Sequence, residues 1–288
     1  RLDCTCITYL AQSIGRGLAN VRTRIIQKIQ QRIHGTNVAY LADQIRDMVA
    51  FVERHTGKPL DEGKLRQAIE NTNRTRKIMK DVYQLAHNVP SPTDGRLLTN
   101  FGLVMPLFFG TEAAVEIAQA YKDEFTVRVD NGIPGVPDEK LRLLWIQNRI
   151  QFNNPLVELL EKEYQANIVS DELNDIFWDP IDPQDPYPGL ARRAIALPLN
   201  GSIQRRIGHL QKLARAYSLD GAINPCHWGC RQGAGARGLI SDGLKEIGVP
   251  VLNLEVDCVD KRNFAEGQLR TRIEAFVEML ESRPRPAS

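Results

Sequence analysis

The C-terminal half of the chain alternates short apolar runs with amphipathic helical patterns, and this alternation limits the fold more than any other feature. The apolar runs occupy residues 143–146, 166–169, 220–224 and 249–255. Strands that alternate with helices form a mostly parallel sheet with helices on both faces. We therefore expect an α/β fold with a flavodoxin-like sheet, in which the strands at 220–224 and 249–255 are neighbours.

The helices of this half are expected between and after the strands. Apolar residues recur with helical spacing at 155–164, 202–217, 239–247 and 266–281. The stretch 179–188 contains too many prolines for a regular element, so we expect a long surface loop there.

The first half of the chain carries mostly helical spacing. Helices are expected at 7–31, 38–55, 61–85 and 111–125, with a mixed apolar segment at 95–110. Glycine and proline give residues 131–137 the composition of a linker. We therefore expect two parts, a mainly helical region over residues 1–140 and a flavodoxin-like α/β domain over residues 141–288.

The overall composition excludes several classes of function. Charged residues make up 25% and hydrophobic residues 42%, as in ordinary globular domains. The net charge of +2 gives no reason to expect nucleic acid or a membrane as partner. No apolar run approaches the roughly 20 residues of a membrane span, and no signal peptide is visible. We expect a cytoplasmic protein, and because the chain opens on Arg1 rather than Met, a processed or partial one.

The five cysteines are the main candidates for chemistry. An odd number of cysteines without an export signal indicates a reducing compartment, where clustered thiols bind metal or act in catalysis. Cys4 and Cys6 have C-x-C spacing, and Cys226 and Cys230 have C-x3-C spacing, neither of which is the C-x2-C of a zinc ribbon. Thiolates also suit iron–sulfur clusters, and three of them would leave one iron open to substrate. Cys258 is expected to be a buried apolar filler.

The segment that contains Cys226 and Cys230 lies where a ligand is expected. The two thiols follow the strand at 220–224, and ligands of open α/β sheets bind at the carboxyl ends of strands. We expect both thiols on a loop that leads into a glycine-rich turn. That turn would open a helix whose free N–H groups favour an anionic ligand.

A dinucleotide site is the competing interpretation of the same segment. Gly233, Gly235 and Gly238 match G-x-G-x-x-G, and Glu255 ends the next strand, where a ribose-binding acid belongs. The fingerprint requires its first glycine close to the strand end, whereas residues 225–232 intervene here. We therefore expect no binding of NAD or NADP.

Three features carry a resemblance to a known family. They are the Cys230 segment, the strand Val249-Pro-Val-Leu-Asn-Leu-Glu-Val-Asp257 and the run Glu266-Gly-Gln-Leu-Arg-Thr-Arg-Ile-Glu-Ala-Phe-Val-Glu-Met-Leu280. Together they resemble the C-terminal end of the 2-hydroxyacyl-CoA dehydratase / benzoyl-CoA reductase family. The helical stretch 64–85 resembles the helix between the two α/β domains of that family. The resemblance extends from about residue 37 to the end and is strongest over the last seventy or so residues.

The resemblance implies an iron–sulfur subunit that holds a [4Fe–4S] cluster through cysteines and acts on an acyl-CoA thioester. It also implies a homologous second subunit in a heteromer and an ATP-dependent iron–sulfur activator protein. In the family, the activator injects a low-potential electron, and a ketyl radical of the thioester then expels the 2-hydroxyl group. In benzoyl-CoA reductases the same electron supply reduces an aromatic ring, which is the alternative activity. A third alternative is a structural subunit without a cluster.

The resemblance also implies different roles for the individual cysteines. Cys230 matches the C-terminal cluster ligand of the family, and Cys226 lies beside it as an additional candidate. Cys4 or Cys6 would match a ligand at the end of an N-terminal α/β domain that is mostly absent from this chain. Residues 1–140 are then expected to be a remnant of that domain or a connector to it.

Three residues near the thiols are candidates for catalysis. Glu255 and Asp257 end a strand, and either is a candidate proton carrier or a helix cap. His227 flanks the thiols and, like Trp228, could contact a cluster sulfur or exclude water from it. The basic residues of the third expected helix are most simply a solvated face, although some of them could meet a polyphosphate; they are Arg66, Arg74, Arg76, Lys77 and Lys80.

Overall fold

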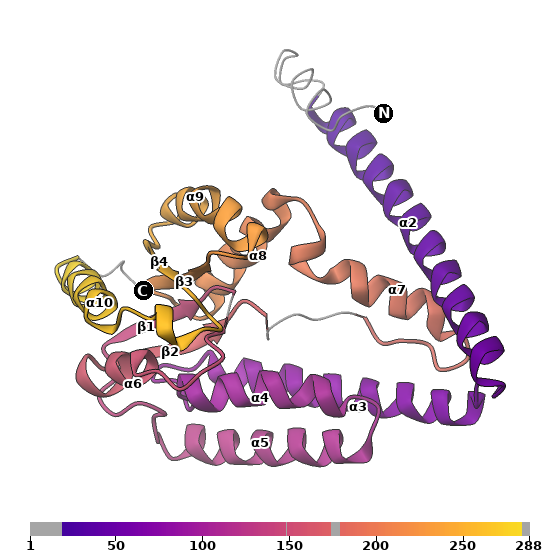
Figure 1. Ribbon diagram of the computed structural model, residues 1–288, viewed down its shortest axis with the longest axis horizontal. Coiled ribbons are helices and arrows are strands. Elements are labelled where there is room, and N and C mark those ends of the chain that lie inside the picture. The colour runs from indigo at the N-terminus through magenta and orange to yellow at the C-terminus, as the bar shows by residue number, and fades with distance from the viewer. Residues whose placement is uncertain (1–18, 148, 174–178, 284–288) are drawn as a thin grey trace.

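The computed structural model describes the backbone of residues 19–147, 149–173 and 179–283, without the side chains of residues 19–34, 99 and 103–106. Helices α3 to α5 lie along one side of the molecule, and a four-stranded sheet with its own helices lies on the other, while helix α2 runs in a different direction (Figure 1). None of the helices in these described ranges combines the length and apolar character that crossing a membrane requires. The division into two domains near residue 140 stays a prediction.

The long first helix corrects the expectation of two helices in this region. Helix α2 runs without interruption from Ala19 to Thr56, and its N-terminal end extends beyond the rest of the molecule (Figure 1). The residues between 31 and 38, which include Gly35, continue the helix. A single glycine costs only about 1 kcal/mol relative to alanine inside a helix, so it does not end one.

The next three helices form the rest of the helical region. They are α3 (Glu62–Ala86), α4 (Gly95–Phe108) and α5 (Glu112–Asp130). The side chains of Asp61, Asp94 and Thr111 cap them by accepting hydrogen bonds from backbone N–H groups of the first turns. The segment expected to be mixed is therefore helix α4. Its sequence contains Gly102 and Pro106, which are unfavourable inside a helix, so the sequence did not identify it.

The sheet confirms the predicted fold class. Its strands are β1 (Leu141–Trp145), β2 (Ala166–Asp171), β3 (Gly221–His227) and β4 (Val251–Val256). They are all parallel and follow the order β2-β1-β3-β4, which is the flavodoxin-like order of the first four strands. As predicted, β3 and β4 are neighbours, with Ala222 opposite Val251.

Apolar clusters cover both faces of the sheet, as the continuous burial of β1 and β2 requires. One face packs against α6 (Leu156–Glu158), the π-helical turn Leu159–Glu163 and α10 (Glu266–Glu281). The other face packs against α8 (Ile203–Ala216) and α9 (Arg231–Lys245). The helices thus leave the carboxyl ends of the strands as the edge at which polar groups gather.

Helix α7 (Pro186–Ala196) corrects part of the expected loop at 179–188. The helix begins inside that stretch at Pro186, because proline is favoured in the first helical turn. Its Ala191 packs against Val38 and Ala42 of α2. A short 3₁₀ turn, Pro198–Asn200, then leads into α8.

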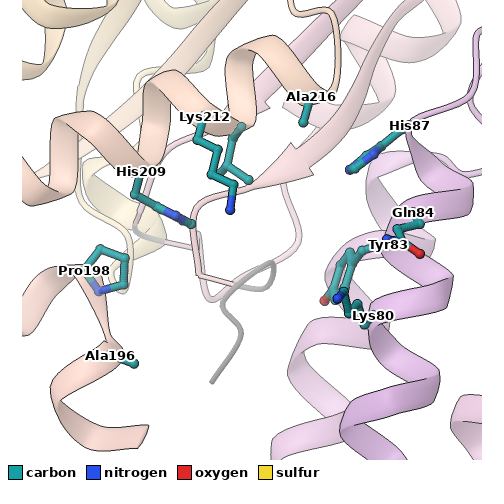
Figure 2. Close-up of a pocket in the computed structure, with 10 residues that line it drawn as sticks. Lys80, Tyr83, Gln84, His87, Ala196, Pro198, His209, Lys212 and Ala216 are labelled. Atoms are coloured by element: carbon teal, nitrogen blue, oxygen red, sulfur yellow. The ribbon is translucent and has the colours of Figure 1, made fainter. Parts of the chain in front are cut away.

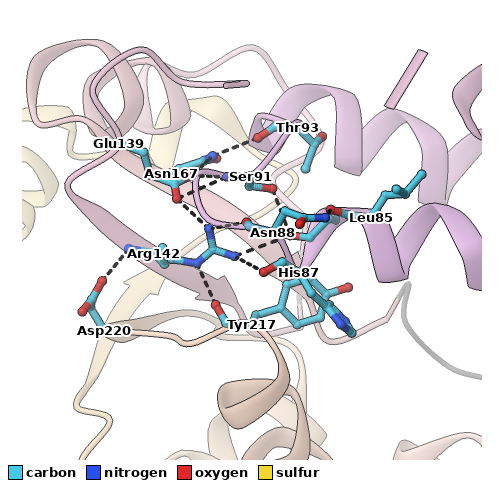
Figure 3. Close-up of polar contacts among 11 residues, drawn as sticks. Leu85, His87, Asn88, Ser91, Thr93, Glu139, Arg142, Asn167, Tyr217 and Asp220 are labelled. Carbon is cyan, nitrogen blue, oxygen red and sulfur yellow. Dashed lines mark hydrogen bonds and ion pairs between the residues drawn. The ribbon is translucent and has the colours of Figure 1, made fainter. Parts of the chain in front are cut away.

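Arg142 on β1 joins the helical region to the sheet (Figure 3). Its guanidinium forms an ion pair of 2.6 Å with Glu139 and donates to the carbonyl oxygens of Asn88, at 3.0 Å, and Tyr217, at 2.7 Å. Glu139 also accepts a hydrogen bond from Asn167 on β2. The guanidinium also donates to the carbonyl oxygens of Ala86 and His87 at the end of α3, where a helix leaves carbonyl groups without helical partners.

Glu161 makes a second connection, from the π-helical turn to α4. Its carboxylate accepts hydrogen bonds from the backbone N–H groups of Gly95, at 2.6 Å, and Ile168, at 3.5 Å. Burial raises the pKa of Glu161 from 4.5 to about 7, although these hydrogen bonds act in the opposite direction. A Cβ atom at position 95 would lie 2.8 Å from the carboxylate, so this approach needs glycine.

This raised pKa predicts a pH-dependent loss of stability. The folded protein holds the Glu161 proton more tightly than the unfolded chain, so this contribution is present below pH 4.5 and is lost as pH rises through about 7. Between pH 5.5 and pH 8 the loss should be about 2 kcal/mol. Glu161→Gln should remove this component, as measured by urea unfolding at both pH values. The exposed Glu70→Gln is the control, and parallel pH dependence of wild type and Glu161→Gln would contradict the assignment.

Candidate functional site

The candidate site lies at the carboxyl edge of the sheet, between β1 and β3. The strand order reverses between these two strands, and the crevice at such a switch point is the usual ligand site of open α/β sheets. Gln147 follows β1, and Cys230 follows β3. Their side chains meet across the crevice, with the Nε2 atom of Gln147 donating to the Sγ atom of Cys230 at 3.2 Å.

Cys230 occupies the N-cap position of helix α9. Its carbonyl oxygen accepts hydrogen bonds from the N–H groups of Gly233 and Ala234, which lie in the first turn of the helix. The thiol is partly exposed, whereas the other two cysteines of the described ranges, Cys226 and Cys258, are buried. The positive end of a helix, an N–H donor and access from solvent are the surroundings that a metal-bound thiolate needs.

A buried network holds Gln147 in position. Arg206 on α8 pairs with Glu172 through two contacts, Nε to Oε1 at 2.6 Å and Nη2 to Oε2 at 2.8 Å, and also donates to the Oε1 atom of Gln147. A guanidinium can only donate hydrogen bonds, so the amide oxygen of Gln147 must face Arg206. The amide nitrogen is then turned towards Cys230. Gln147 also has a φ of 53°, which lies in a backbone region that residues other than glycine rarely adopt.

Cys226 and Cys230 have different surroundings, which corrects the expectation that both thiols lie on one loop. It lies within strand β3, opposite Glu255 of β4. Its sulfur lies 3.5 Å from the carbonyl oxygen of Asn224 and 3.7 Å from the side-chain oxygen of Asn253. Burial raises the pKa of the Cys226 thiol, although the nearby Arg237 acts in the opposite direction. Burial thus favours the protonated form of the free Cys226 thiol, and its role as a cluster ligand stays a prediction.

The remaining cysteines do not complete a metal site in the described ranges. Cys258 packs in the apolar cluster beneath α10, as the sequence predicts, and burial raises the pKa of its thiol to about 11. Cys4 and Cys6 lie outside the residues that the structure describes. Within residues 19–147, 149–173 and 179–283, no three His, Cys, Asp or Glu side chains are grouped closely enough to hold a metal ion.

The three candidate catalytic residues lie at the ends of β3 and β4. The Nδ1 atom of His227 accepts from the N–H of Cys258 at 3.2 Å, which leaves a proton on Nε2 in the neutral ring. Asp257 accepts from the N–H groups of Val259 and Asp260, and these two bonds lower its pKa to about 2. Glu255 forms an ion pair with Arg237 of α9, which lowers its pKa. Asp257 is thus a cap of the following turn, and Glu255 faces a neighbouring helix.

The glycines of the dinucleotide-like pattern also differ from expectation. Helix α9 begins at Arg231, so Gly233, Gly235 and Gly238 all lie inside the helix and do not form a turn before it. Because pyrophosphate binds to a glycine turn between strand and helix, this geometry disfavours a dinucleotide at this position.

Sequence patterns did not identify Gln147, Glu172 or Arg206. Gln147 and Glu172 follow the ends of β1 and β2, and their position after buried strands was a usable signal. Arg206 carries no such signal, because its amphipathic helix predicts only a polar residue at that position. The structure alone shows that its side chain is 4% exposed and paired with Glu172.

Comparison with known proteins gives consistent matches over nearly the whole chain. The family model described as 2-hydroxyglutaryl-CoA dehydratase, D-component, matches residues 3–280. The alpha subunit of (R)-2-hydroxyglutaryl-CoA dehydratase from Acidaminococcus fermentans is 24% identical over 97% of this chain and 59% of its own length. The alpha subunit of lactoyl-CoA dehydratase from Anaerotignum propionicum is 24% identical over 85% of this chain and 58% of its own length. A benzoyl-CoA reductase subunit from Thauera aromatica is 24% identical over 86% of this chain and 61% of its own length. The chain therefore spans about three fifths of the length of these relatives.

Proposed function

The chain belongs to the 2-hydroxyglutaryl-CoA dehydratase D-component family, and from this premise we propose that it acts as the iron–sulfur subunit of a 2-hydroxyacyl-CoA dehydratase. The reaction would eliminate water from an acyl-CoA thioester after ATP-driven injection of an electron. The names of two relatives as acyl-CoA dehydratase subunits support this activity. The cytoplasmic location expected from cysteine usage stays a prediction.

The observation that carries the proposal is the accessible Cys230 thiol at the switch point of the sheet, in contact with Gln147. A [4Fe–4S] cluster, when bound, supplies one low-potential electron and Lewis-acidic iron. Cys230 fits the role of one ligand because it combines access, a helix N-terminus and an N–H donor. The other ligands would come from outside the described residues, where Cys4 and Cys6 remain candidates.

The residues around Cys230 have separate roles in this proposal. The hydrogen bond from Gln147 stabilises negative charge on the sulfur, and such contacts raise the reduction potential of a cluster. Arg206 and Glu172 orient that amide and are positioning residues. His227 accepts a hydrogen bond at its Nδ1 atom, so its Nε2 atom can hold a proton beyond the end of β3.

Two protein partners follow from the proposed activity. The relatives are named as subunits, which supports a homologous second subunit in a heteromer. An ATP-dependent iron–sulfur activator would deliver the electron. Trp228, two residues before Cys230 in the chain, is 60% exposed and would be available to a docking protein.

Loss of the Cys230 thiol tests the proposal directly. In protein purified anaerobically as its complete assembly, Cys230→Ser should lower the iron and sulfide content and weaken the broad visible absorption, because a serine hydroxyl is a poor cluster ligand. Cys258→Ala is the matched control, since that thiol is buried among apolar side chains. Unchanged iron content and absorption in Cys230→Ser would refute the assignment.

Two alternatives rest on specific observations. The match to a benzoyl-CoA reductase subunit supports a reductase of aromatic acyl-CoA. The burial of Cys226 and Cys258, which leaves Cys230 as the one partly exposed thiol of the described ranges, supports a structural subunit without a cluster. Activity on a 2-hydroxyacyl-CoA against benzoyl-CoA, with activator and ATP, separates the two enzymes. A wild-type assembly whose copy of this chain holds no iron would favour the structural role.

A further inference from the structure

A cavity of about 320 Å³ lies between helices α3 and α8, away from Cys230. Figure 2 shows His209 and Lys212 extending from α8 towards the side chains of α3. Lys80, Tyr83 and His87 line the opposite wall. Two lysines and two histidines therefore face one hollow, and none of the described residues that line it is acidic.

Within the described ranges, the basic side chains of this cavity lack protein partners for their charge. Lys80 and Lys212 form no ion pair with the residues that the structure describes, whereas Arg74 on the same helix as Lys80 pairs with Glu112. The Nε2 atoms of His87 and His209 are buried and have no hydrogen-bond partner among the described residues. Polar atoms in this condition require an explanation, and the hydroxyl groups of a bound ligand, which can both donate and accept, would supply the missing partners.

Several positive charges lie close to the histidines of the cavity. Burial lowers the pKa of His87, and the positive charge of Arg142 lowers it further. Burial also lowers the pKa of His209, and Lys212 and Arg205 act in the same direction, while Glu172 opposes them. Glu172 is already paired with Arg206, so it offsets little of the positive charge around the cavity.

We propose that this cavity binds the phosphate groups of a nucleotide-type ligand, with Lys80 and Lys212 as its two charged contacts. A lysine ammonium is a point charge that binds phosphate well, and two of them on opposite walls match a group with more than one negative charge. A single carboxylate would satisfy only one of them. A cavity of this volume is within the range of small-molecule sites.

A second hollow next to this cavity indicates how a bound ligand would be oriented. It has a volume of about 270 Å³, and its lining includes Ile203, Ala236, Leu239 and Arg231, the residue that follows Cys230. Pro198 lines both hollows, so they adjoin at the 3₁₀ turn before α8. A ligand with phosphates at one end and an uncharged arm would match a basic hollow followed by a mainly apolar one beside Cys230. The CoA part of an acyl-CoA has this form, and this identification rests on the proposed function.

Isothermal titration calorimetry on the complete assembly tests the site. The probes are CoA, adenosine 3′,5′-bisphosphate, inorganic pyrophosphate and pantetheine, which lacks phosphate. Lys80→Gln/Lys212→Gln should weaken the binding of CoA and of the bisphosphate by about tenfold or more, because two charge-assisted contacts are lost. Pantetheine should bind equally weakly to wild type and variant.

The matched control removes the same charge from the same two helices. Lys77→Gln/Arg215→Gln changes exposed residues that do not line the cavity and should alter CoA affinity by less than about twofold. Equal weakening by both double variants would overturn the proposal, since it would show only general electrostatic attraction. Weakened pyrophosphate binding with unchanged CoA affinity would support a site for free phosphates and overturn the CoA assignment.

The same measurements separate this proposal from the proposed function. If Lys80→Gln/Lys212→Gln leaves the affinity for every probe unchanged while iron content and dehydration remain, the cavity assignment alone is overturned. If the wild-type assembly binds no CoA at all, both the CoA assignment and the dehydratase function are overturned. Both lysines are exposed and unpaired within the described structure, so the double variant should fold normally, as a thermal unfolding curve would verify.

Discussion

Replacing Arg206 with methionine should lower the free energy of unfolding by about 3–5 kcal/mol, because it leaves a buried carboxylate without its partner. The Glu172 side chain is fully buried, and Arg206 supplies both of the contacts that compensate its charge. The same substitution removes the donor that orients Gln147, so the hydrogen bond to Cys230 should weaken as well. Urea unfolding measures the first effect.

A second variant separates the stability effect from the effect on Cys230. Arg206→Met/Glu172→Leu removes both charges, and replacing a whole buried pair with apolar residues costs far less than removing one partner. The double variant should therefore recover most of the stability while Gln147 still lacks its anchor. In the iron-loaded assembly of this double variant, the reduction potential of the cluster should fall. The reason is that the hydrogen bond from Gln147 to the Cys230 sulfur, which raises the potential, is weakened. A potential equal to that of wild type would contradict the role of the network in positioning Gln147.

Arg142→Met should also lower the free energy of unfolding by about 3–5 kcal/mol, since it leaves Glu139 buried and unpaired. The Glu139 side chain is only 2% exposed, and the guanidinium of Arg142 also binds carbonyl oxygens beyond α3 and at Tyr217. The substitution removes contacts between the helical region and the sheet, which Figure 3 shows as one network. Backbone amides near the end of α3 should then exchange hydrogen faster.

An exposed ion pair is the control for Arg142. Arg74 of α3 pairs with Glu112 of α5 at the surface, and Arg74→Met should cost less than about 1 kcal/mol by urea unfolding, as exposed pairs usually do. If Arg142→Met costs no more than Arg74→Met, the buried network does not hold the two regions together.

Local patterns in the sequence predicted most of the secondary structure for identifiable reasons. The apolar runs near 143–146 and 220–224 became β1 and β3, because a strand buried on both faces is continuously apolar. The helices at 202–217 and 266–281 were found because one face of each packs on the sheet. Helix α4 was missed because it contains Gly102 and Pro106, and the continuity of α2 was missed because Gly35 resembles a helix break.

The sequence predicted less of the function than of the fold, because the residues of the candidate site meet only in three dimensions. The sequence identified Cys230 through its place after a strand and its polar, glycine-rich surroundings, and the structure places this thiol at the switch point of the sheet. The sequence did not distinguish Cys226 from Cys230. Their difference depends on which of them lies inside the sheet, and strand β3 extends through Cys226 to His227.

The sequence by itself determined the fold class, the neighbouring strands β3 and β4, and Cys230 as a candidate site residue. These follow from patterns that repeat over a few residues and from the rule that parallel strands end at one edge. Only the tertiary structure decided which side chains surround that thiol. Gln147 and Cys230 are 83 positions apart, and Arg206 and Gln147 are 59 positions apart, so no local pattern relates them. Such contacts depend on the packing of α8 and the crossover between β1 and β3, because only packing brings distant residues within hydrogen-bond distance.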